Sequence, residues 1–264
     1  MTINQNRKEY WNESYVKYWQ SRVQEAGLGK SKVIEGDPNT EDDNIYSEIF
    51  SKTPFKRGKL LDVGCAWGRM FPLYIQNEMI IDGVDISSAM IQEARKLWKA
   101  EDQVASIQES EAEKIPFKDS HFENLCCLAV FDATYQDQAM SEFIRVTKPG
   151  GLIYLTGKNT NYHSDDEEAY AAEVGARAKG HPNFFTNVEK LIRDLEQDGH
   201  IIVANYYFPR RGDFAKFNFE DKFYDKFYEF FLVIEVSNKQ TIFNNLSEKY
   251  SKTFKESTGD QKEQ

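Results

Sequence analysis

The stretch Lys59-Leu60-Leu61-Asp62-Val63-Gly64-Cys65-Ala66-Trp67-Gly68-Arg69 decides the fold. A short apolar run that ends at a glycine is typical of a buried parallel strand entering a tight turn. Residues 70–75 then predict the first turns of a helix, where Pro72 is tolerated because the first helical N–H groups have no intrahelical partner. In α/β sheets such strand–turn–helix units lie where ligands bind. On its own, the spacing of Gly64 and Gly68 fits a purely structural turn equally well.

Length and composition limit the classes of function. The 264 residues suffice for one large domain, and 40% hydrophobic residues allow a substantial core. A net charge of −10 argues against non-specific binding to nucleic acid or to an anionic membrane, and solubility is its plainest explanation.

The three cysteines, Cys65, Cys126 and Cys127, form no Cys-x-x-Cys pair, so we expect reduced thiols, no metal site and a cytoplasmic protein. Residues 1–10 are polar and contain no apolar signal core. No segment reaches membrane-spanning length.

Strand-like and helix-like segments alternate along the chain. The expected strands are 60–63, 79–86, 104–107, 123–131, 152–156, 201–208 and 230–236. Five strand–helix units followed by two further strands predict an α/β fold with a doubly wound, Rossmann-like seven-stranded sheet.

The amino-terminal segment 9–29 has helical periodicity and many aromatic residues. Trp11, Tyr15, Tyr18 and Trp19 recur at helical spacings and share one face. This face is either a core-facing stripe or a lid over a ligand mouth. We divide the chain into an aromatic helical lid (1–50), a Rossmann-like domain (51–250) with an acceptor-side insertion (158–185), and a polar, disordered tail (251–264).

Acidic side chains follow three of the expected strands. Asp62 ends the first strand, and Asp85 ends the second about twenty residues after the glycine turn, where an acid accepts hydrogen bonds from ribose hydroxyls. Glu111 follows the third strand, where its carboxylate either accepts from an exocyclic amine or is a solvated loop acid.

Four segments together resemble the class I S-adenosylmethionine-dependent methyltransferases of the small-molecule type. They are Leu60–Gly68, Gly83-Val84-Asp85-Ile86-Ser87, Ala112-Glu113-Lys114-Ile115-Pro116-Phe117, and Arg145-Val146-Thr147-Lys148-Pro149-Gly150-Gly151. They come in the family's order and spacing, and the resemblance covers roughly residues 55–210. Ala66 stands where the family often has glycine, and Glu111 where it usually has aspartate.

The resemblance implies S-adenosylmethionine as cofactor and a role for each matching residue. Asp62, Gly64, Cys65 and Gly68 would frame its methionine end, Asp85 would hold the ribose, and Ile86 would lie against adenine. Glu111 and Ala112 would bind the adenine edge, and Leu128 would place its backbone near the sulfonium. We also assign Tyr18 of the lid to the cofactor site.

The acceptor side matches the family less well, because Asp132-Ala133-Thr134-Tyr135 follows the fourth strand. An oxygen acceptor usually needs a general base, whereas a nitrogen acceptor need not. The candidate bases are His181, His163, Tyr135 and Asp132, although each of them is more simply explained as a solvated loop residue. Arg210 and Arg211 are candidates to clamp an anionic acceptor or are a surface basic pair.

These patterns predict methyl transfer to an oxygen or nitrogen of a small molecule, such as a sugar, a nucleotide-linked or a phosphorylated metabolite. A nicotinamide-dependent dehydrogenase is the first alternative, although Gly64–Gly68 lacks the Gly-x-Gly-x-x-Gly pattern that packs a pyrophosphate. The second alternative is a non-catalytic, S-adenosylmethionine-binding partner subunit. The oligomeric state is not predicted.

Overall fold

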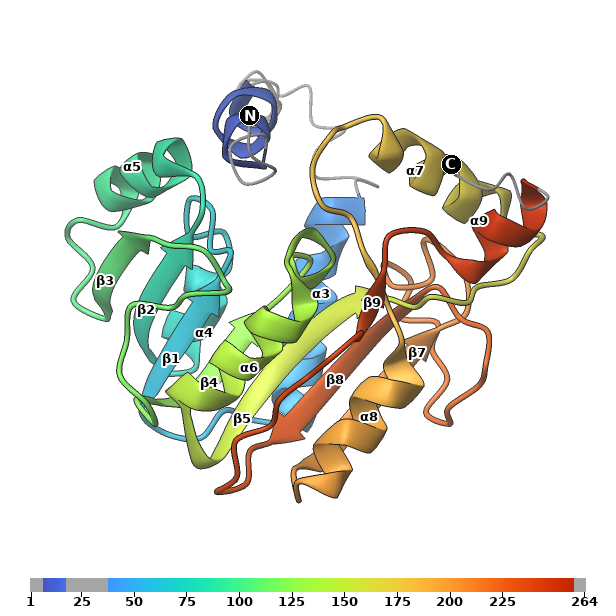
Figure 1. Ribbon diagram of the computed structural model, residues 1–264. Coiled ribbons are helices and arrows are strands. Elements are labelled where there is room, and N and C mark those ends of the chain that lie inside the picture. The colour runs from blue at the N-terminus through green and yellow to red at the C-terminus, as the bar shows by residue number, and fades with distance from the viewer. Residues whose placement is uncertain (1–6, 18–37, 259–264) are drawn as a thin grey trace.

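A seven-stranded sheet forms the centre of the computed structural model, which describes residues 7–17 and 38–258 (Figure 1). The strand order is β3-β2-β1-β4-β5-β8-β7. The strands are β1 (Lys59–Val63), β2 (Ile80–Asp85), β3 (Val104–Glu109), β4 (Phe122–Cys127), β5 (Thr147–Lys158), β7 (Ile201–Phe208) and β8 (Glu229–Glu235). The predicted Rossmann-like sheet is confirmed.

Strand direction places the loops that matter on one edge. Strands β1 to β5 pair in parallel, whereas β8 runs antiparallel between β5 and β7. Because all parallel strands end at the same edge, the loops after β1, β2, β3 and β4 meet there. Near-continuous apolar runs, such as Leu125-Cys126-Cys127 of β4, fit strands that are buried on both faces.

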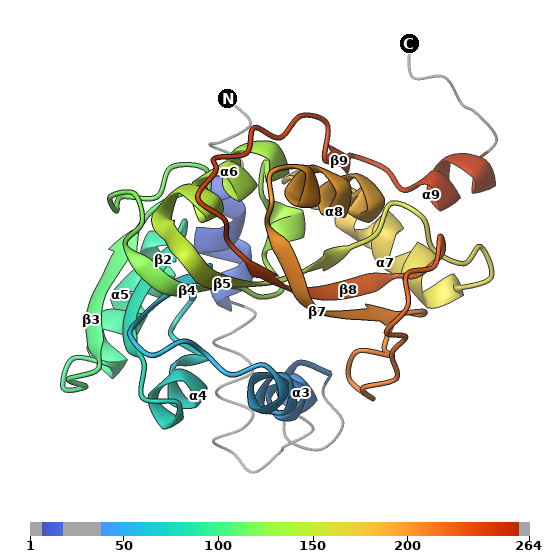
Figure 2. The ribbon, with the colours of Figure 1, turned by 90° about the horizontal axis from the view of Figure 1, so that it is seen from below.

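Helices cover both faces of the sheet (Figure 2). The helices α3 (Pro38–Lys52), α4 (Phe71–Gln76) and α5 (Ser88–Leu97) lie on one face, and α6 (Gln136–Val146) and α8 (Val188–Gln197) lie on the other. Each face has its own apolar cluster: Phe71 and Ile91 belong to the first, and Phe143 and Leu191 to the second. No helix within 7–17 or 38–258 is both long and apolar enough to cross a membrane.

Several local features differ from the sequence predictions. Strand β4 ends at Cys127 instead of residue 131, and β5 begins at Thr147 instead of residue 152. The sequence pattern predicts a loop over residues 30–43 and a short amphipathic helix at 45–50, but helix α3 begins at Pro38. Acidic residues in its first two turns make this part of the sequence resemble a loop. The start of the polar tail is ordered: α9 (Lys252–Ser257) follows Ser251, whose hydroxyl accepts from the Phe254 N–H. A small second sheet of β6 (Phe185–Thr186) and β9 (Ser247–Glu248) was not predicted.

The carboxyl-terminal segment is fixed by a buried carboxylate. Glu173 of α7 (Glu167–Arg177) is fully buried and accepts from the Tyr162 hydroxyl at 2.8 Å, the Ser251 hydroxyl at 2.6 Å and the Ser251 N–H at 2.9 Å. The Arg177 guanidinium lies 3.0 Å from the same carboxylate. This network joins α7 and α9 beside the carboxyl edge of the sheet (Figure 1).

We expect Glu173→Ala to lower the free energy of unfolding by about 3 kcal/mol, because it leaves the partly buried Arg177 guanidinium and two hydroxyls without their partner. Chemical denaturation followed by circular dichroism measures this change. Glu167→Ala, an exposed acid on the same helix, is the matched control and should change stability by less than about 0.5 kcal/mol. Equal stabilities of the two variants would contradict a structural role for Glu173.

Candidate active site

The glycine turn after β1 fits closely against the loop after β4. Gly64 has φ +78°, and a Cβ there would lie 2.4 Å from a Val130 methyl carbon. The N–H groups of Gly64 and Cys65 donate to the Val84 carbonyl at 2.8 and 3.1 Å, which ties the turn to β2. Glycine is therefore required at position 64 both for its positive φ and for this close approach.

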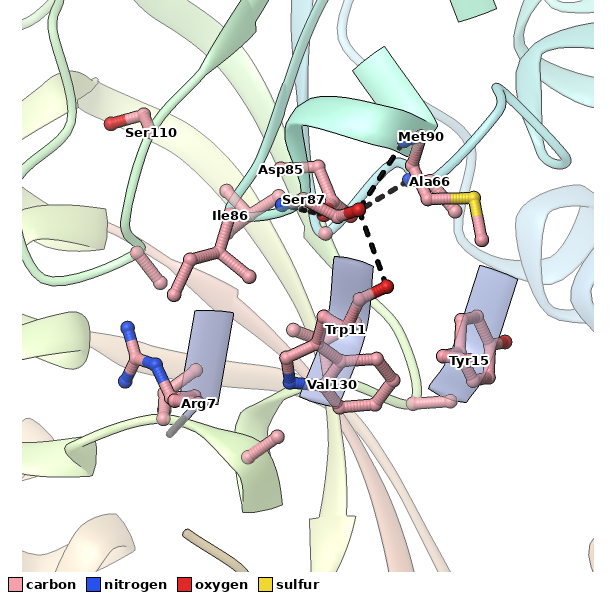
Figure 3. A pocket seen from close by; sticks show the side chains of 16 residues that line it. Arg7, Trp11, Tyr15, Ala66, Asp85, Ile86, Ser87, Met90, Ser110 and Val130 are labelled. Atoms are coloured by element: carbon pink, nitrogen blue, oxygen red, sulfur yellow. Dashed lines mark hydrogen bonds between the residues drawn. The ribbon is translucent and has the colours of Figure 1, made fainter. Parts of the chain in front are cut away.

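Asp85 connects the first two loops of the carboxyl edge (Figure 3). Its Oδ2 accepts from the Ala66 N–H at 2.9 Å, and its Oδ1 accepts from the Ser87 N–H at 2.8 Å. Burial is the main cause that raises the pKa of this carboxyl, and the two N–H donors oppose it. Each carboxylate oxygen keeps a further lone pair, so the group can accept from two adjacent hydroxyls.

Asp62 lies beneath the glycine turn and is 3% exposed. Its Oδ1 accepts from the Tyr74 hydroxyl at 3.3 Å, while its Oδ2 is buried and has no hydrogen-bond partner among the described residues. Burial, the largest cause, and the nearby Asp85 carboxylate raise the pKa of Asp62 to about 7. A cation bound nearby would favour its ionised form.

A narrow cavity of about 100 Å³ opens above these loops. Trp11 and Tyr15 of the amino-terminal helix face Asp85, Ile86 and Ser87 across it (Figure 3). The complete lining is Arg7, Trp11, Tyr15, Val63, Gly64, Ala66, Asp85, Ile86, Ser87, Met90, Ser110, Ala112, Ala129, Val130, Ala133 and Thr134. We call this space the first cavity.

One side of the amino-terminal helix is held by a buried ion pair. The Arg7 guanidinium, in a residue that is 2% exposed, donates to both carboxylate oxygens of Glu113 at 2.7 and 2.9 Å. The Tyr135 N–H also donates to Glu113, and the Arg7 guanidinium lies 5.3 Å from the Tyr135 ring centre. Bidentate geometry in a buried place fixes both partners strongly.

The other side of this helix is held by an amide. The Asn12 Oδ1 accepts from the Ser87 hydroxyl at 2.9 Å and from the Ala89 N–H at 3.2 Å, at the beginning of α5. The helix, which contains a π-helical segment (η1, Tyr10–Tyr15), is thus attached to both walls of the first cavity.

A second cavity of about 380 Å³ lies against the ends of β4, β5 and β8. Its walls carry charged and aromatic side chains: Tyr46, Ala129, Asp132, Thr156, Gly157, Lys158, Glu168, Arg211, Gly212, Phe214, Ala215, Glu229 and Phe230. Its volume lies within the range of small-molecule sites.

Ala129 lines both cavities. It has φ +57°, an uncommon value for a residue with a side chain, and its N–H donates to the Thr156 hydroxyl at 2.6 Å. The two cavities therefore adjoin at Ala129, whose backbone is fixed by this hydrogen bond.

The residues expected at the cofactor divide into two groups. Gly64, Asp85, Ile86 and Ala112 line the first cavity. Asp62 lies beneath the glycine turn and does not line this cavity, and neither do four others: Cys65, Gly68, Leu128 and Glu111. Tyr18 lies outside the described residues.

Packing explains why these four residues are placed elsewhere. The Cys65 sulfur packs on Gly83, and Gly68, at φ +82°, makes room for Trp98 and Phe71. Leu128 is buried in the apolar cluster, so Ala129 takes the position expected for it. Glu111 lies 3.9 Å from the Lys8 ammonium, and neighbouring Ser110 and Ala112 face the cavity instead.

The candidate bases also divide. Asp132 lines the second cavity, where the Lys158 ammonium donates to its carboxylate. Neither His163 nor Tyr135 lines either cavity. The Tyr135 ring lies beneath the Arg7 guanidinium instead. His181 lies outside both as well: its ring centre is 4.1 Å from that of Tyr10, with the two rings tilted by 30°.

The contacts of His181 settle its tautomer. Its Nδ1 lies 2.7 Å from the Pro182 carbonyl oxygen and must therefore carry a hydrogen, which leaves Nε2 as a buried lone pair without a partner among the described residues. Burial lowers the pKa of this ring, so it is neutral at pH 7.

The sequence analysis missed Arg7, Ala129 and Lys158. Arg7 precedes the aromatic stripe and belongs to no sequence pattern. An alanine in a sequence also gives no sign that its φ will be positive, as it is at Ala129. Lys158 directly follows the predicted fifth strand, at the edge where ligands bind, and this position was an available signal.

Part of the chain is similar to known proteins. Residues 61–155 match the methyltransferase domain family. The ubiquinone/menaquinone biosynthesis C-methyltransferase UbiE of Laribacter hongkongensis is 38% identical over 72 residues, which cover 27% of this chain and 30% of that protein. UbiE of Neisseria gonorrhoeae is 33% identical over 105 residues, 38% of this chain and 42% of the relative. The chain thus matches less than half the length of these relatives.

Solved structures agree on the fold. The YcgJ protein of Bacillus subtilis aligns with a TM-score of 0.55 at 14% identity, over 74% of this chain and 99% of that one. The [4+2]-cyclase SpnF aligns with a TM-score of 0.52 at 17% identity, over 74% and 81%. Because a cyclase appears among the neighbours, the fold alone does not determine the reaction.

We expect Asp85→Asn to weaken binding of S-adenosylhomocysteine at least about tenfold, because an amide in place of a charged acceptor loses strong hydrogen bonds. Isothermal titration calorimetry measures the affinity, and the melting temperature checks the fold. Glu109→Gln, an exposed acid at the end of the neighbouring strand, is the control and should bind as the parent does. An unchanged affinity in Asp85→Asn would remove Asp85 from the cofactor site.

A pH dependence follows from Asp62. Its pKa of about 7 in the folded chain exceeds the ordinary value of 3.8, so the folded state holds a proton that the unfolded state releases between these values. Asp62 therefore costs stability as pH rises from 4 to 7, by up to about 4 kcal/mol.

We expect Asp62→Asn to remove this dependence. The unfolding free energy of the variant minus that of the parent should grow between pH 4 and 7 and level off above pH 8. Urea denaturation across this range measures the difference, and a constant difference would contradict a buried, protonated Asp62.

Proposed function

We propose that the chain, whose residues 61–155 form a methyltransferase domain of the class I, S-adenosylmethionine-dependent type, methylates a small molecule held in the second cavity. One observation carries this proposal: the first cavity, with the Asp85 carboxylate on its wall, and the second cavity meet at Ala129. Methyl transfer needs donor and acceptor side by side, and adjoining cavities provide that arrangement.

The residues of the first cavity fit an adenosyl cofactor. Asp85 would accept from the ribose hydroxyls, while Ile86 and Ala112 would border the adenine. A bound cation would favour the ionised form of Asp62, whose Oδ2 lies near the glycine turn and has no hydrogen-bond partner among the described residues. When bound, S-adenosylmethionine supplies an electrophilic methyl group on a sulfonium.

The amino-terminal helix would act as a lid. At about 100 Å³ the first cavity is smaller than ordinary small-molecule sites, and Trp11 and Tyr15 line it from this helix. Entry of the cofactor would therefore require the helix to move outward. Once closed, the two aromatic rings would exclude water and border the cation with their π faces.

Residues around the second cavity would position the acceptor and move its proton. The Thr156 hydroxyl holds the Ala129 backbone where the cavities meet. Beside it, Asp132 would take a proton from the acceptor, and the Lys158 ammonium would stabilise the oxygen or nitrogen left behind. Burial disfavours the charged form of Lys158, yet Asp132 and other acids keep its pKa raised, so it stays a cation.

Carbon is a further candidate for the acceptor atom, in addition to the oxygen and nitrogen predicted from the sequence. The UbiE relatives are named for C-methylation in ubiquinone and menaquinone biosynthesis, so a ring carbon activated by an ionised hydroxyl is a further candidate. Tyr46, Phe214 and Phe230 in the walls favour a flat ring over a sugar. The walls from Lys158 onward lie outside the matched residues 61–155, so the acceptor must be argued from this chain's own residues.

Ligand-shift melting with S-adenosylmethionine, S-adenosylhomocysteine and NAD tests the cofactor, since a ligand of the folded state raises the midpoint. We expect both adenosyl ligands to raise it and NAD to leave it unchanged. Formation of S-adenosylhomocysteine is then measured over a panel of phenols, quinols and aromatic amines. Stabilisation by NAD alone would overturn the proposal. Tight binding without turnover on any acceptor would favour the non-catalytic partner subunit.

A further inference from the structure

We propose that Arg211 is the specificity residue of the second cavity and binds a carboxylate or phosphate group on a flat, ring-bearing acceptor. This inference rests on the proposed function, because it names the class of molecule that the cavity takes. The chemistry of anion recognition is common to both groups, and a guanidinium fork suits either of them.

Two adjacent arginines differ in their surroundings. The Arg210 guanidinium lies 2.9 and 3.1 Å from the two carboxylate oxygens of Asp165, at the exposed surface. Arg211 is exposed as well, but it lines the second cavity and forms no ion pair with any residue in 7–17 or 38–258. The clamp predicted from both arginines is therefore reduced to Arg211 alone.

The Arg211 loop is held in position by α7. The Arg211 N–H donates to Asp166 Oδ2 at 2.9 Å, and Asp166 Oδ1 accepts from the Ala169 N–H at 3.0 Å. Burial raises the pKa of the Tyr228 hydroxyl, and the Arg211 guanidinium, which lies near it, acts to lower that pKa. A cation with a fixed backbone and a neutral partner retains donors for a ligand.

The acidic residues of the same cavity have other roles. The Lys158 ammonium donates to Asp132, and Glu229 is the cross-strand partner of Lys158 between β5 and β8. Glu168 is exposed in the first turn of α7, where the helix dipole favours a carboxylate. Arg211 is therefore the charge in this wall that is best placed to select a ligand group.

The cavity sets the length of the acceptor. Ala129 and Asp132 follow β4, whereas Arg211 follows β7, and these strands are three positions apart in the sheet. At about 4.8 Å per strand the two ends are roughly 14 Å apart. Tyr46, Phe214 and Phe230 supply aromatic wall, so the ring is expected between the reacting end and the anionic end.

A charge series on one ring tests the inference without knowledge of the natural acceptor. Benzoate, phenyl phosphate, benzyl alcohol and benzylamine are titrated by NMR into the full chain saturated with S-adenosylhomocysteine. We expect one or both anions to bind at least about tenfold more tightly than benzyl alcohol, and benzylamine to bind most weakly. The affinities for benzoate and for phenyl phosphate show whether the cavity prefers a carboxylate or a phosphate group.

Arg211→Gln should weaken binding of the preferred anion about tenfold and leave benzyl alcohol unchanged, whereas Arg210→Gln is the matched control and should bind as the parent does. Equal affinities for charged and neutral rings, a preference for benzylamine, or equal effects of the two substitutions would overturn the role of Arg211. Failure of S-adenosylhomocysteine to bind the parent chain would count against the proposed function instead, so the two failures are distinguishable.

Discussion

The carboxylate of Asp85 is the interaction on which the rest of the site depends. One oxygen holds the loop after β1 through the Ala66 N–H, and the other holds the start of α5 through the Ser87 N–H. Ser87 is in turn bound by Asn12 of the amino-terminal helix. A single carboxyl group thus sets the positions of the glycine turn, the next helix and the helix above the first cavity.

The sheet could be predicted from the sequence because its signals are local. Apolar runs that end at glycine or at an acid mark the carboxyl ends of β1 and β2, and Pro149-Gly150-Gly151 marks the boundary between α6 and the inner part of β5. The first turns of α3 and the whole of α9 were harder to predict, since polar segments without an apolar stripe resemble loops. Helix α9 derives stability from distant contacts such as Ser251 with Glu173.

The site could be predicted only in part. Asp85, Ile86 and Ala112 were predictable because strand ends fix where their side chains lie. The position of Ala129 depends on a positive φ and on the Thr156 hydroxyl, twenty-seven residues away, and neither can be read from a spacing. The same holds for Arg7, whose partner Glu113 lies 106 residues along the chain. His181 looked like a base because of its residue type, yet tertiary packing places it against Tyr10.

The central claim is that the first cavity holds an adenosyl sulfonium cofactor and the second cavity its acceptor. A crystal structure of the chain soaked with S-adenosylhomocysteine tests this most directly. The account predicts density with the ribose on Asp85, adenine between Ile86 and Ala112, and the sulfur directed toward Ala129. A first cavity that stays empty, or that accepts only a nicotinamide cofactor, would contradict it.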